Sequence, residues 1–354
     1  MNGVRCSDEA AACDNRGMRA SDKFLALTAA VLLASIWPLT SFAQVFRSTT
    51  DLVNVWATVT DRAGRIVPTL TTEAFSVKEE GVGQVITFFR SEDDTPISVA
   101  IVVDTSGSMT DKLADVQDAL RHFARLLRPA DEVFFLRFSN DVEQLAGPDD
   151  RDRLEQRIGR LQADGGTALF DAARDGAITV TRGQHGKRVV LLITDGNDTT
   201  SRSTKRDAID AVTRSEALLY AVGIGHGERG SFGHDIFGRG GGHGGGMARG
   251  RPTDDRVDAG TLRDLAEPTG GRHYVLEQAH RGGRDLIDET VQEIAAELRH
   301  QYTLGYYPSS PSSDGKFRRI AVETADRSLR VRARRGYIPR PPAALAPAPA
   351  QRSR

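Results

Sequence analysis

An aspartate and two serines follow an apolar run of the chain at a spacing that could bind a metal ion. Asp104, Ser106 and Ser108 come after residues 97–103, which are mostly apolar and β-branched and therefore typical of a buried strand. In open α/β sheets, ligands bind at the carboxyl ends of the strands. Carboxylate and hydroxyl oxygens are hard donors of the kind that Mg²⁺ prefers. These residues therefore form the first loop of a candidate metal site.

Two later segments carry oxygen donors in a similar structural context. Thr167 follows two glycines and opens an expected helix that extends to about residue 181. Asp195 directly follows residues 188–194, whose apolar run predicts a central strand. A simpler interpretation remains open for all three loops, because Asp, Ser and Thr also cap helices.

The pattern Asp-x-Ser-x-Ser after an apolar strand, with a later threonine loop and a second aspartate, resembles the metal-ion-dependent adhesion site of von Willebrand factor A domains. The resemblance implies that one divalent cation is held by five residues, namely Asp104, Ser106, Ser108, Thr167 and Asp195. The expected ion is Mg²⁺, with Mn²⁺ or Ca²⁺ as substitutes. A partner protein is expected to offer an Asp or Glu side chain, which would displace a water that Mg²⁺ tends to retain.

The elements between residues 96 and 300 must position these loops, and they alternate between strands and helices. Leu113, Val116, Leu120, Phe123 and Leu127 recur at spacings of three and four, which is one face of a helix. Apolar runs predict strands at residues 97–103, 132–138, 142–145, 188–194, 217–224 and 272–275. The alternation predicts a doubly wound, Rossmann-like α/β fold, with a mainly parallel six-stranded sheet and helices on both of its faces.

Residues 44–95 and 301–338 flank this region and have the pattern of β structure, with one expected turn at residues 80–83. Each flank has too few strands for an independent sandwich. We therefore expect both flanks to pair into one small all-β, sandwich-like domain of six or seven strands, with the α/β domain of residues 96–300 inserted into it. This order, with the segments GYYPSSPSSDGKFRRI and RRGYIP, resembles exported bacterial VWFA-related domain proteins over about residues 46–338.

Residues 1–43 are expected to be an N-terminal extension and a signal peptide. An apolar run at residues 24–37 precedes small residues at 41–43 that suit a cleavage site. The run is short for a membrane span, although an uncleaved anchor is an alternative. Cleavage would remove Cys6 and Cys13, the two cysteines of the chain, and leave no stable membrane span. The expected localisation is outside the cytoplasm, as a periplasmic, cell-surface or secreted protein.

Two further segments lack the composition of a packed core. Eleven of the 26 residues from 226 to 251 are glycine, so this stretch is expected to be a mobile insertion. Residues 339–354 are rich in Pro and Ala and are expected to form a disordered tail. The formal charge of −1 gives no basic excess, which argues against a nucleic-acid partner. The oligomeric state is not indicated by the sequence.

Binding is favoured over catalysis as the function of this chain. Hydrolysis at a metal site also needs a placed base or a second metal, and no His or Glu lies close to the three loops in the sequence. His122 lies on the first expected helix and is interpreted as a surface or packing residue. The preferred function is thus a non-enzymatic adhesion or scaffolding module. A metal-dependent hydrolase and an accessory subunit of an envelope enzyme complex are the alternatives.

Overall fold

The computed structural model describes residues 52–92, 95–227, 256–276, 283–310 and 314–339. All of these residues belong to one compact unit, Thr49–Arg354. The expected signal peptide with both cysteines, residues 228–255 of the glycine-rich region, and the expected tail from residue 340 lie outside the described residues. Within the described ranges, no helix is both long and apolar enough to span a membrane.

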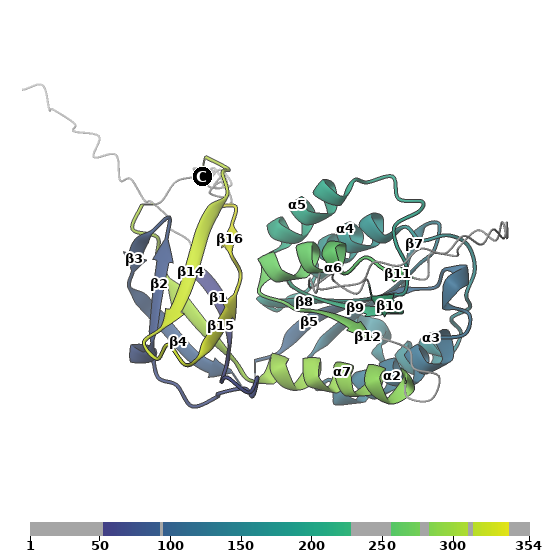
Figure 1. Cartoon of the computed structure of the whole chain (residues 1–354), viewed down its shortest axis with the longest axis horizontal. Helices are drawn as coiled ribbons and strands as arrows, with labels where there is room; N and C mark the ends of the chain where they lie inside the picture. The colour runs from purple at the N-terminus through teal and green to yellow at the C-terminus, as the bar shows by residue number, and fades with distance from the viewer. Residues whose placement is uncertain (1–51, 93–94, 228–255, 277–282, 311–313, 340–354) are drawn as a thin grey trace, which may run out of the picture. The chain divides into compact units, whose positions relative to one another are not determined.

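A six-stranded sheet forms the centre of the α/β domain (Figure 1), with the strand order β12-β9-β8-β5-β6-β7. Neighbouring strands are parallel, except that β7 is antiparallel to β6. The predicted mainly parallel sheet is therefore confirmed, and the carboxyl ends of β5 and β8 lie side by side. The strands are β5 (Ile97–Asp104), β6 (Glu132–Phe138), β7 (Val142–Ala146), β8 (Lys187–Thr194), β9 (Leu218–Ile224) and β12 (His273–Leu276).

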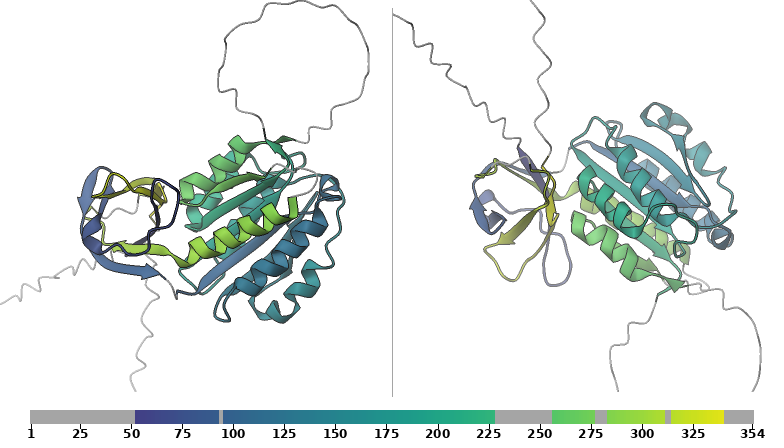
Figure 2. Two further views of the ribbon diagram at one scale, coloured as in Figure 1. Left: turned by 60° about the horizontal axis from the view of Figure 1, so that its bottom comes forward. Right: turned by 90° about the horizontal axis from the view of Figure 1, so that it is seen from above.

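Helices cover both faces of this sheet (Figure 2). Along β8, Val189 and Leu191 pack in one hydrophobic core, whereas Val190 and Leu192 pack in the other. A strand that is buried on both faces needs such an uninterrupted apolar run, because its successive side chains point to opposite faces. One face is covered by α2 (Leu113–Leu126), α3 (Leu154–Ile158) and α7 (Gly283–Arg299), and the other by α4 (Leu169–Val180), α5 (Lys205–Ser215) and α6 (Ala259–Ala266).

The flanks of the chain form two antiparallel sheets that enclose a third hydrophobic core. The first sheet has the order β15-β1-β13-β4, and the second has the order β16-β14-β2-β3. Each sheet combines strands from both flanks, which confirms the predicted β domain with an inserted α/β domain, although the predicted domain boundaries stay a prediction. The strands are β1 (Val53–Thr60), β2 (Phe75–Glu79), β3 (Val82–Gln84), β4 (Ile86–Glu92), β13 (Gln301–Tyr306), β14 (Arg318–Thr324), β15 (Arg330–Ala333) and β16 (Gly336–Tyr337).

The predicted turn at residues 80–83 was too long. Only Glu80 and Gly81 form it, with φ values of 49° and 82°. Positive φ at both central residues is the geometry of a two-residue hairpin turn whose twist matches that of the flanking strands. Val82 therefore already pairs with Glu79, and residues 82–84 form β3. With β3 and the short β16, the described residues of this domain contain eight strands rather than six or seven.

Short elements connect these layers. His226 and Gly227, the first residues of the predicted insertion, form β10 (His226–Gly227), which pairs in parallel with β11 (Arg256–Val257). The predicted start of the insertion at residue 226 stays a prediction, because residues 228–255 lie outside the described residues. The 3₁₀ helices are η1 (Thr72–Ala74), η2 (Gly107–Met109), η3 (Pro148–Arg153) and η4 (Glu267–Thr269).

A buried polar network lies where α7 runs into β13. Glu297, near the end of α7, is 3% exposed and accepts hydrogen bonds from Thr58 (3.0 Å) and from the Tyr220 hydroxyl. Its other carboxylate oxygen lies 2.6 Å from the Arg332 guanidinium. A buried carboxylate is tolerated only when it is paired and hydrogen-bonded. Glu297 therefore needs both its ion pair and its hydrogen bonds.

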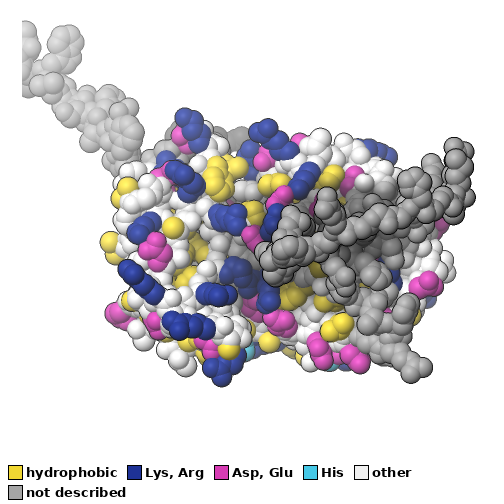
Figure 3. All heavy atoms as spheres, in the orientation of Figure 1, with side chains coloured by type: hydrophobic (Ala, Val, Ile, Leu, Met, Phe, Trp, Pro, Cys, Tyr) yellow, Lys and Arg dark blue, Asp and Glu magenta, His cyan; other side chains and the backbone are white. Residues whose placement is uncertain are grey.

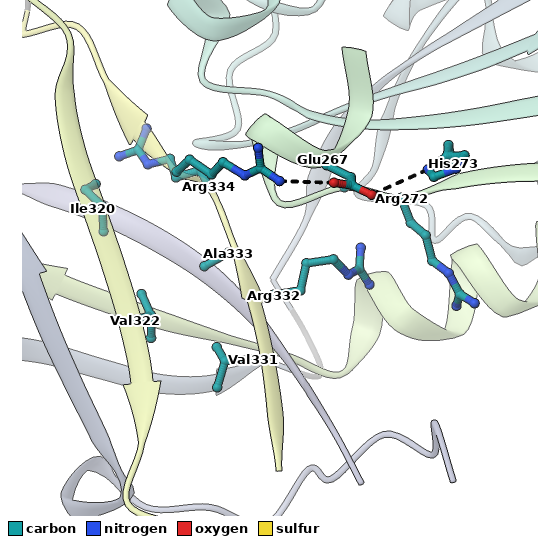
Figure 4. Close-up of a pocket in the computed structure, with 11 residues that line it drawn as sticks. Glu267, Arg272, His273, Ile320, Val322, Val331, Arg332, Ala333 and Arg334 are labelled. Atoms are coloured by element: carbon teal, nitrogen blue, oxygen red, sulfur yellow. Dashed lines mark hydrogen bonds and ion pairs between the residues drawn. The ribbon is translucent and has the colours of Figure 1, made fainter. Parts of the chain in front are cut away.

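A cavity of about 460 Å³ lies close to this network, between residues of η4 and β12 and residues of β14 and β15. In Figure 4, Glu267 points toward His273, and their side chains are 3.9 Å apart. Glu267 also pairs with Arg335 at 3.0 Å. Figure 3 shows Lys and Arg side chains interspersed with acidic ones on the face of the molecule that is seen in Figure 1.

Candidate metal centre

The three predicted loops meet at one edge of the α/β sheet. Asp104 is the last residue of β5, and Asp195 directly follows β8, which is the parallel neighbour of β5. Thr167 lies two residues before α4. The backbone joins the first two loops, because the Gly107 N–H donates to the carbonyl oxygen of Gly165 at 3.0 Å.

Direct side-chain contacts connect the loops as well. The hydroxyl oxygens of Ser106 and Ser108 are 3.1 Å apart, and Ser108 donates to Asp195 at 2.7 Å. A Cβ atom placed on Gly196 would lie 3.6 Å from the Thr167 hydroxyl and 4.0 Å from the Ser108 hydroxyl. Both hydroxyl oxygens therefore lie within 4.0 Å of one point beside Gly196. The contacts bring the predicted serines, the threonine and the second aspartate together.

Asp104 is fully buried beside this cluster. One of its oxygens accepts a hydrogen bond from the Ser106 N–H at 2.8 Å, and the other accepts one from the Thr194 hydroxyl at 2.6 Å. The pKa of Asp104 is raised to about 6, mainly because burial disfavours the charged carboxylate and to a smaller extent because Asp195 lies nearby. The hydrogen bonds from Ser106 and Thr194 lower the pKa of Asp104, but they do not offset the effect of burial. A cation at this carboxylate would favour the ionised form.

Lys112 is a member of this cluster that the sequence analysis missed. Its ammonium lies 2.7 Å from the second oxygen of Asp195, and the two side chains are 7% and 0% exposed. Lys112 lies at the residue before α2 and outside the motif, so no spacing rule pointed to it. It supplies a positive charge that matches the charge of Asp195.

The loops that present the oxygen donors are held by further hydrogen bonds. The backbone of Thr167 bonds to Thr199 in both directions, with a Thr167 N–H to Thr199 hydroxyl distance of 2.9 Å and a Thr199 N–H to Thr167 carbonyl distance of 2.8 Å. The side-chain oxygen of Asn140 accepts the Gly166 N–H at 2.8 Å. Gly165 has a φ of +82°, and a Cβ there would lie 2.8 Å from the Asn140 amide nitrogen. The glycines before Thr167 are therefore required by backbone geometry and close packing.

The donor set suits a hard divalent cation. It contains three neutral hydroxyls and two carboxylates, and all of these are oxygen ligands of the kind that Mg²⁺ prefers. In the described part of the chain, no three His, Cys, Asp or Glu residues are arranged so that they alone could hold a metal ion. A cluster without imidazole or thiolate ligands gives transition metals little advantage. The residues therefore fit Mg²⁺ at the place where the sequence predicted it.

The predicted site residues also fall within one recognised sequence family. Residues 99–197 match the family model described as the von Willebrand factor type A domain. The chain contains a von Willebrand factor A domain. The matched region of the A domain runs from within β5 to just beyond Asp195 and includes all five predicted metal ligands. The paired flanking strands of the β domain lie outside the match.

Comparison with solved structures gives weak similarities. The conserved hypothetical protein BatB from Bacteroides thetaiotaomicron is 17% identical, with a TM-score of 0.42 over 57% of this chain and 99% of that chain. A von Willebrand factor type A protein from Catenulispora acidiphila is 13% identical, with a TM-score of 0.45 over 79% and 72%. The pilus adhesin SpaC from Lactobacillus rhamnosus GG is 11% identical, with a TM-score of 0.43 over 64% and 34%. No curated protein matches the sequence. Structural similarity at this level does not indicate which ligand this chain binds.

Proposed function

We propose that this protein is an exported, metal-dependent protein-binding module. One Mg²⁺ ion would be held by Asp104, Ser106, Ser108, Thr167 and Asp195, and an Asp or Glu side chain of a partner protein would complete its coordination. The observation that supports this proposal is the convergence of hydroxyls and carboxylates from three loops at one sheet edge. Export is proposed from the apolar run at residues 24–37 of the sequence.

The charges around the cluster explain why an acidic partner would bind. Lys112 already matches the charge of Asp195, and Asp104 accepts only neutral hydrogen-bond donors in the contacts that the structure shows. A divalent ion would therefore meet one unmatched carboxylate and leave about one positive charge. A carboxylate from a partner would neutralise that charge, and the loops would need little rearrangement because they are already hydrogen-bonded to one another.

Thermal unfolding tests the metal part of this proposal. Mg²⁺ should raise the Tm of the metal-free protein, because the native loops bind the ion and the unfolded chain does not. At ~100 times the Kd, the gain in stability is about 2.7 kcal/mol, which is several degrees in Tm for a domain of this size. Calorimetry with increasing Mg²⁺ measures the shift.

Serine variants provide the matched comparison. Ser108→Ala removes one exposed hydroxyl of the cluster and should reduce the Mg²⁺ response strongly while leaving the fold intact. Ser76→Ala removes an exposed hydroxyl from β2 and should leave the response unchanged. A wild-type melting curve that does not respond to Mg²⁺, or equal responses in both variants, would contradict the proposed site.

Catalysis is not favoured by any observation in the described residues. His122, on α2, lies 2.6 Å from Asp288 on α7, so it is engaged in a pair between two helices. The expectation that the protein is not an enzyme remains a prediction. The hydrolase and accessory-subunit alternatives gain no support from the geometry.

A further inference from the structure

A second pocket opens beside the metal loops. It has a volume of about 400 Å³ and is lined by the end of β6, β7, α3 and the segment that leads to Thr167. Its size is in the range of roughly 300–1,000 Å³ that is usual for ligand sites. The lining residues that matter here are Arg137, Arg157, Arg160, Asp164, Leu145 and Leu161.

The pocket shares a wall with the candidate metal centre. The Asp164 N–H donates to the carbonyl oxygen of Thr105 at 2.7 Å, and Thr105 is adjacent to Asp104. Arg137 precedes Phe138, which is the residue of β6 that pairs with Asp104. A peptide that reaches the metal loops could therefore also reach this pocket.

The pocket carries an excess of positive charge. Within the described residues, no ion pair joins Arg157 or Arg160 to an acidic side chain. Arg137 pairs with Glu143 at 2.6 Å, but both side chains are well exposed, and exposed pairs of this kind are weak. Asp164 is the only acidic residue of the lining. The lining therefore contains three arginines and one acidic residue.

One of these arginines has an unsatisfied donor. The Nε of Arg157 is buried and has no hydrogen-bond partner among the described residues. Such donors are uncommon in native proteins, because an unpartnered buried polar group lowers stability. The Arg157 side chain therefore lacks one of its usual partners, and guanidinium groups match the fork of a carboxylate in shape and charge.

We propose that this pocket binds a second acidic side chain of the same partner segment that approaches the metal. This inference rests on the proposed function and makes it more specific: the partner segment carries two acidic residues a few positions apart. Arg157 and Arg160 bind the second carboxylate, and Leu145 and Leu161 pack against its aliphatic part. The arginine pocket therefore selects among acidic partners, which a single metal-bound carboxylate does not.

Synthetic peptides test this inference on the full chain. Fluorescein-labelled Gly-Ser peptides carry either one glutamate or two glutamates separated by two, four or six residues, and anisotropy measures their binding with Mg²⁺ and with EDTA. The best two-glutamate peptide should bind wild type about tenfold more tightly than the one-glutamate peptide. The double variant R157Q/R160Q should reduce that preference to within about twofold, while its Mg²⁺-dependent rise in Tm stays as in wild type.

Two further variants keep this result interpretable. R206Q/R214Q removes two exposed arginines from α5, which does not line the pocket, and should retain the full preference. If circular dichroism shows that R157Q/R160Q is unfolded, R160Q alone serves, because Arg160 is exposed. It should then lose at least part of the preference.

The outcomes separate this inference from the proposed function. Equal binding of both peptides to Mg²⁺-stabilised wild type would overturn the arginine pocket and leave the metal site standing. If Mg²⁺ affects neither Tm nor binding, the proposed metal function fails. A preference that persists in EDTA and depends on Arg157 and Arg160 would still support the pocket. A single-stranded oligonucleotide that binds more tightly than every peptide, through the same arginines, would overturn the assignment to a protein partner.

Discussion

At the scale of single residues, the site combines neutral and charged side chains, and only the buried charged ones need a partner of opposite charge. Ser106 and Ser108 are neutral hydroxyls that bond to each other, whereas Asp195 is a fully buried carboxylate that needs a cation. Lys112 supplies that cation. It therefore both stabilises the protein without metal and lowers the negative charge that attracts a metal ion.

Replacing Lys112 with Met separates these two effects. The metal-free variant should be less stable by about 3–5 kcal/mol, because one partner of a buried pair is left unpaired. Its affinity for Mg²⁺ should rise by on the order of tenfold, because the site gains one unmatched negative charge. Denaturant unfolding in EDTA measures the first effect, and calorimetric titration measures the second.

Lys205 provides a matched control for this variant. Its pair with Asp264 has the same length of 2.7 Å, but the two side chains are 36% and 44% exposed. Lys205→Met should change stability by less than about 1 kcal/mol and leave Mg²⁺ affinity unchanged. Equal effects of the two substitutions would show that burial of the Lys112–Asp195 pair determines neither the loss of stability nor the change in Mg²⁺ affinity.

At the scale of elements, the turn after η4 shows how closely the strands of the β domain pack on the A domain. Gly270 has a φ of +83°, and a Cβ there would lie 2.7 Å from the backbone of Ala333 and Arg334. The adjacent backbone also bonds across this contact, because the Arg335 N–H donates to the carbonyl oxygen of Pro268 at 2.9 Å. The position thus requires glycine for its conformation and for its lack of a side chain.

Alanine at two glycine positions distinguishes these requirements. Gly64 has a similar φ of +80° but nothing within 4 Å of a Cβ. Gly64→Ala should cost about 1–2 kcal/mol for the left-handed conformation alone. Gly270→Ala should cost that plus about 1–3 kcal/mol for the steric overlap, measured by chemical denaturation. Equal losses would mean that the contact with Ala333 adjusts freely.

At the scale of the whole molecule, the β domain depends on strands from both flanks of the chain. β1 lies between β13 and β15, and both of these neighbours come from the C-terminal flank. The buried side chains Val55, Ala57 and Val59 of β1 share a core with Tyr302 and Leu304. Neither flank can bury its apolar residues without the other.

Truncation tests this dependence. A chain that ends at residue 300 should aggregate, because β1 loses both neighbours and exposes unpaired edges and apolar side chains. A chain that ends at residue 339 keeps every strand of the described part and should remain monodisperse in size-exclusion chromatography. A soluble, protease-resistant product ending at residue 300 would show that the N-terminal flank folds by itself.

The sequence alone determined the order of the elements and the identity of the five candidate ligands. Apolar runs and helical spacings are local properties, and they predicted β5, α2 and β8 to within one or two residues at each end. The motif fixed Asp104 and the two serines by spacing, and the parallel sheet then required their loops to share an edge. The extent of β3 was missed, because a two-residue turn with positive φ at Glu80 leaves little local signal.

Only the tertiary structure decided which distant groups meet. Lys112 and Asp195 are far apart in the chain and form an ion pair because α2 begins beside the end of β8. The grouping of Arg137, Arg157 and Arg160 beside the metal loops likewise depends on how α3 packs against β7. Ion pairs and pockets are produced by packing between elements, whereas periodicity reports only which face of an element is buried. For this reason the sequence indicated where a metal would bind, and the fold showed which charges surround it.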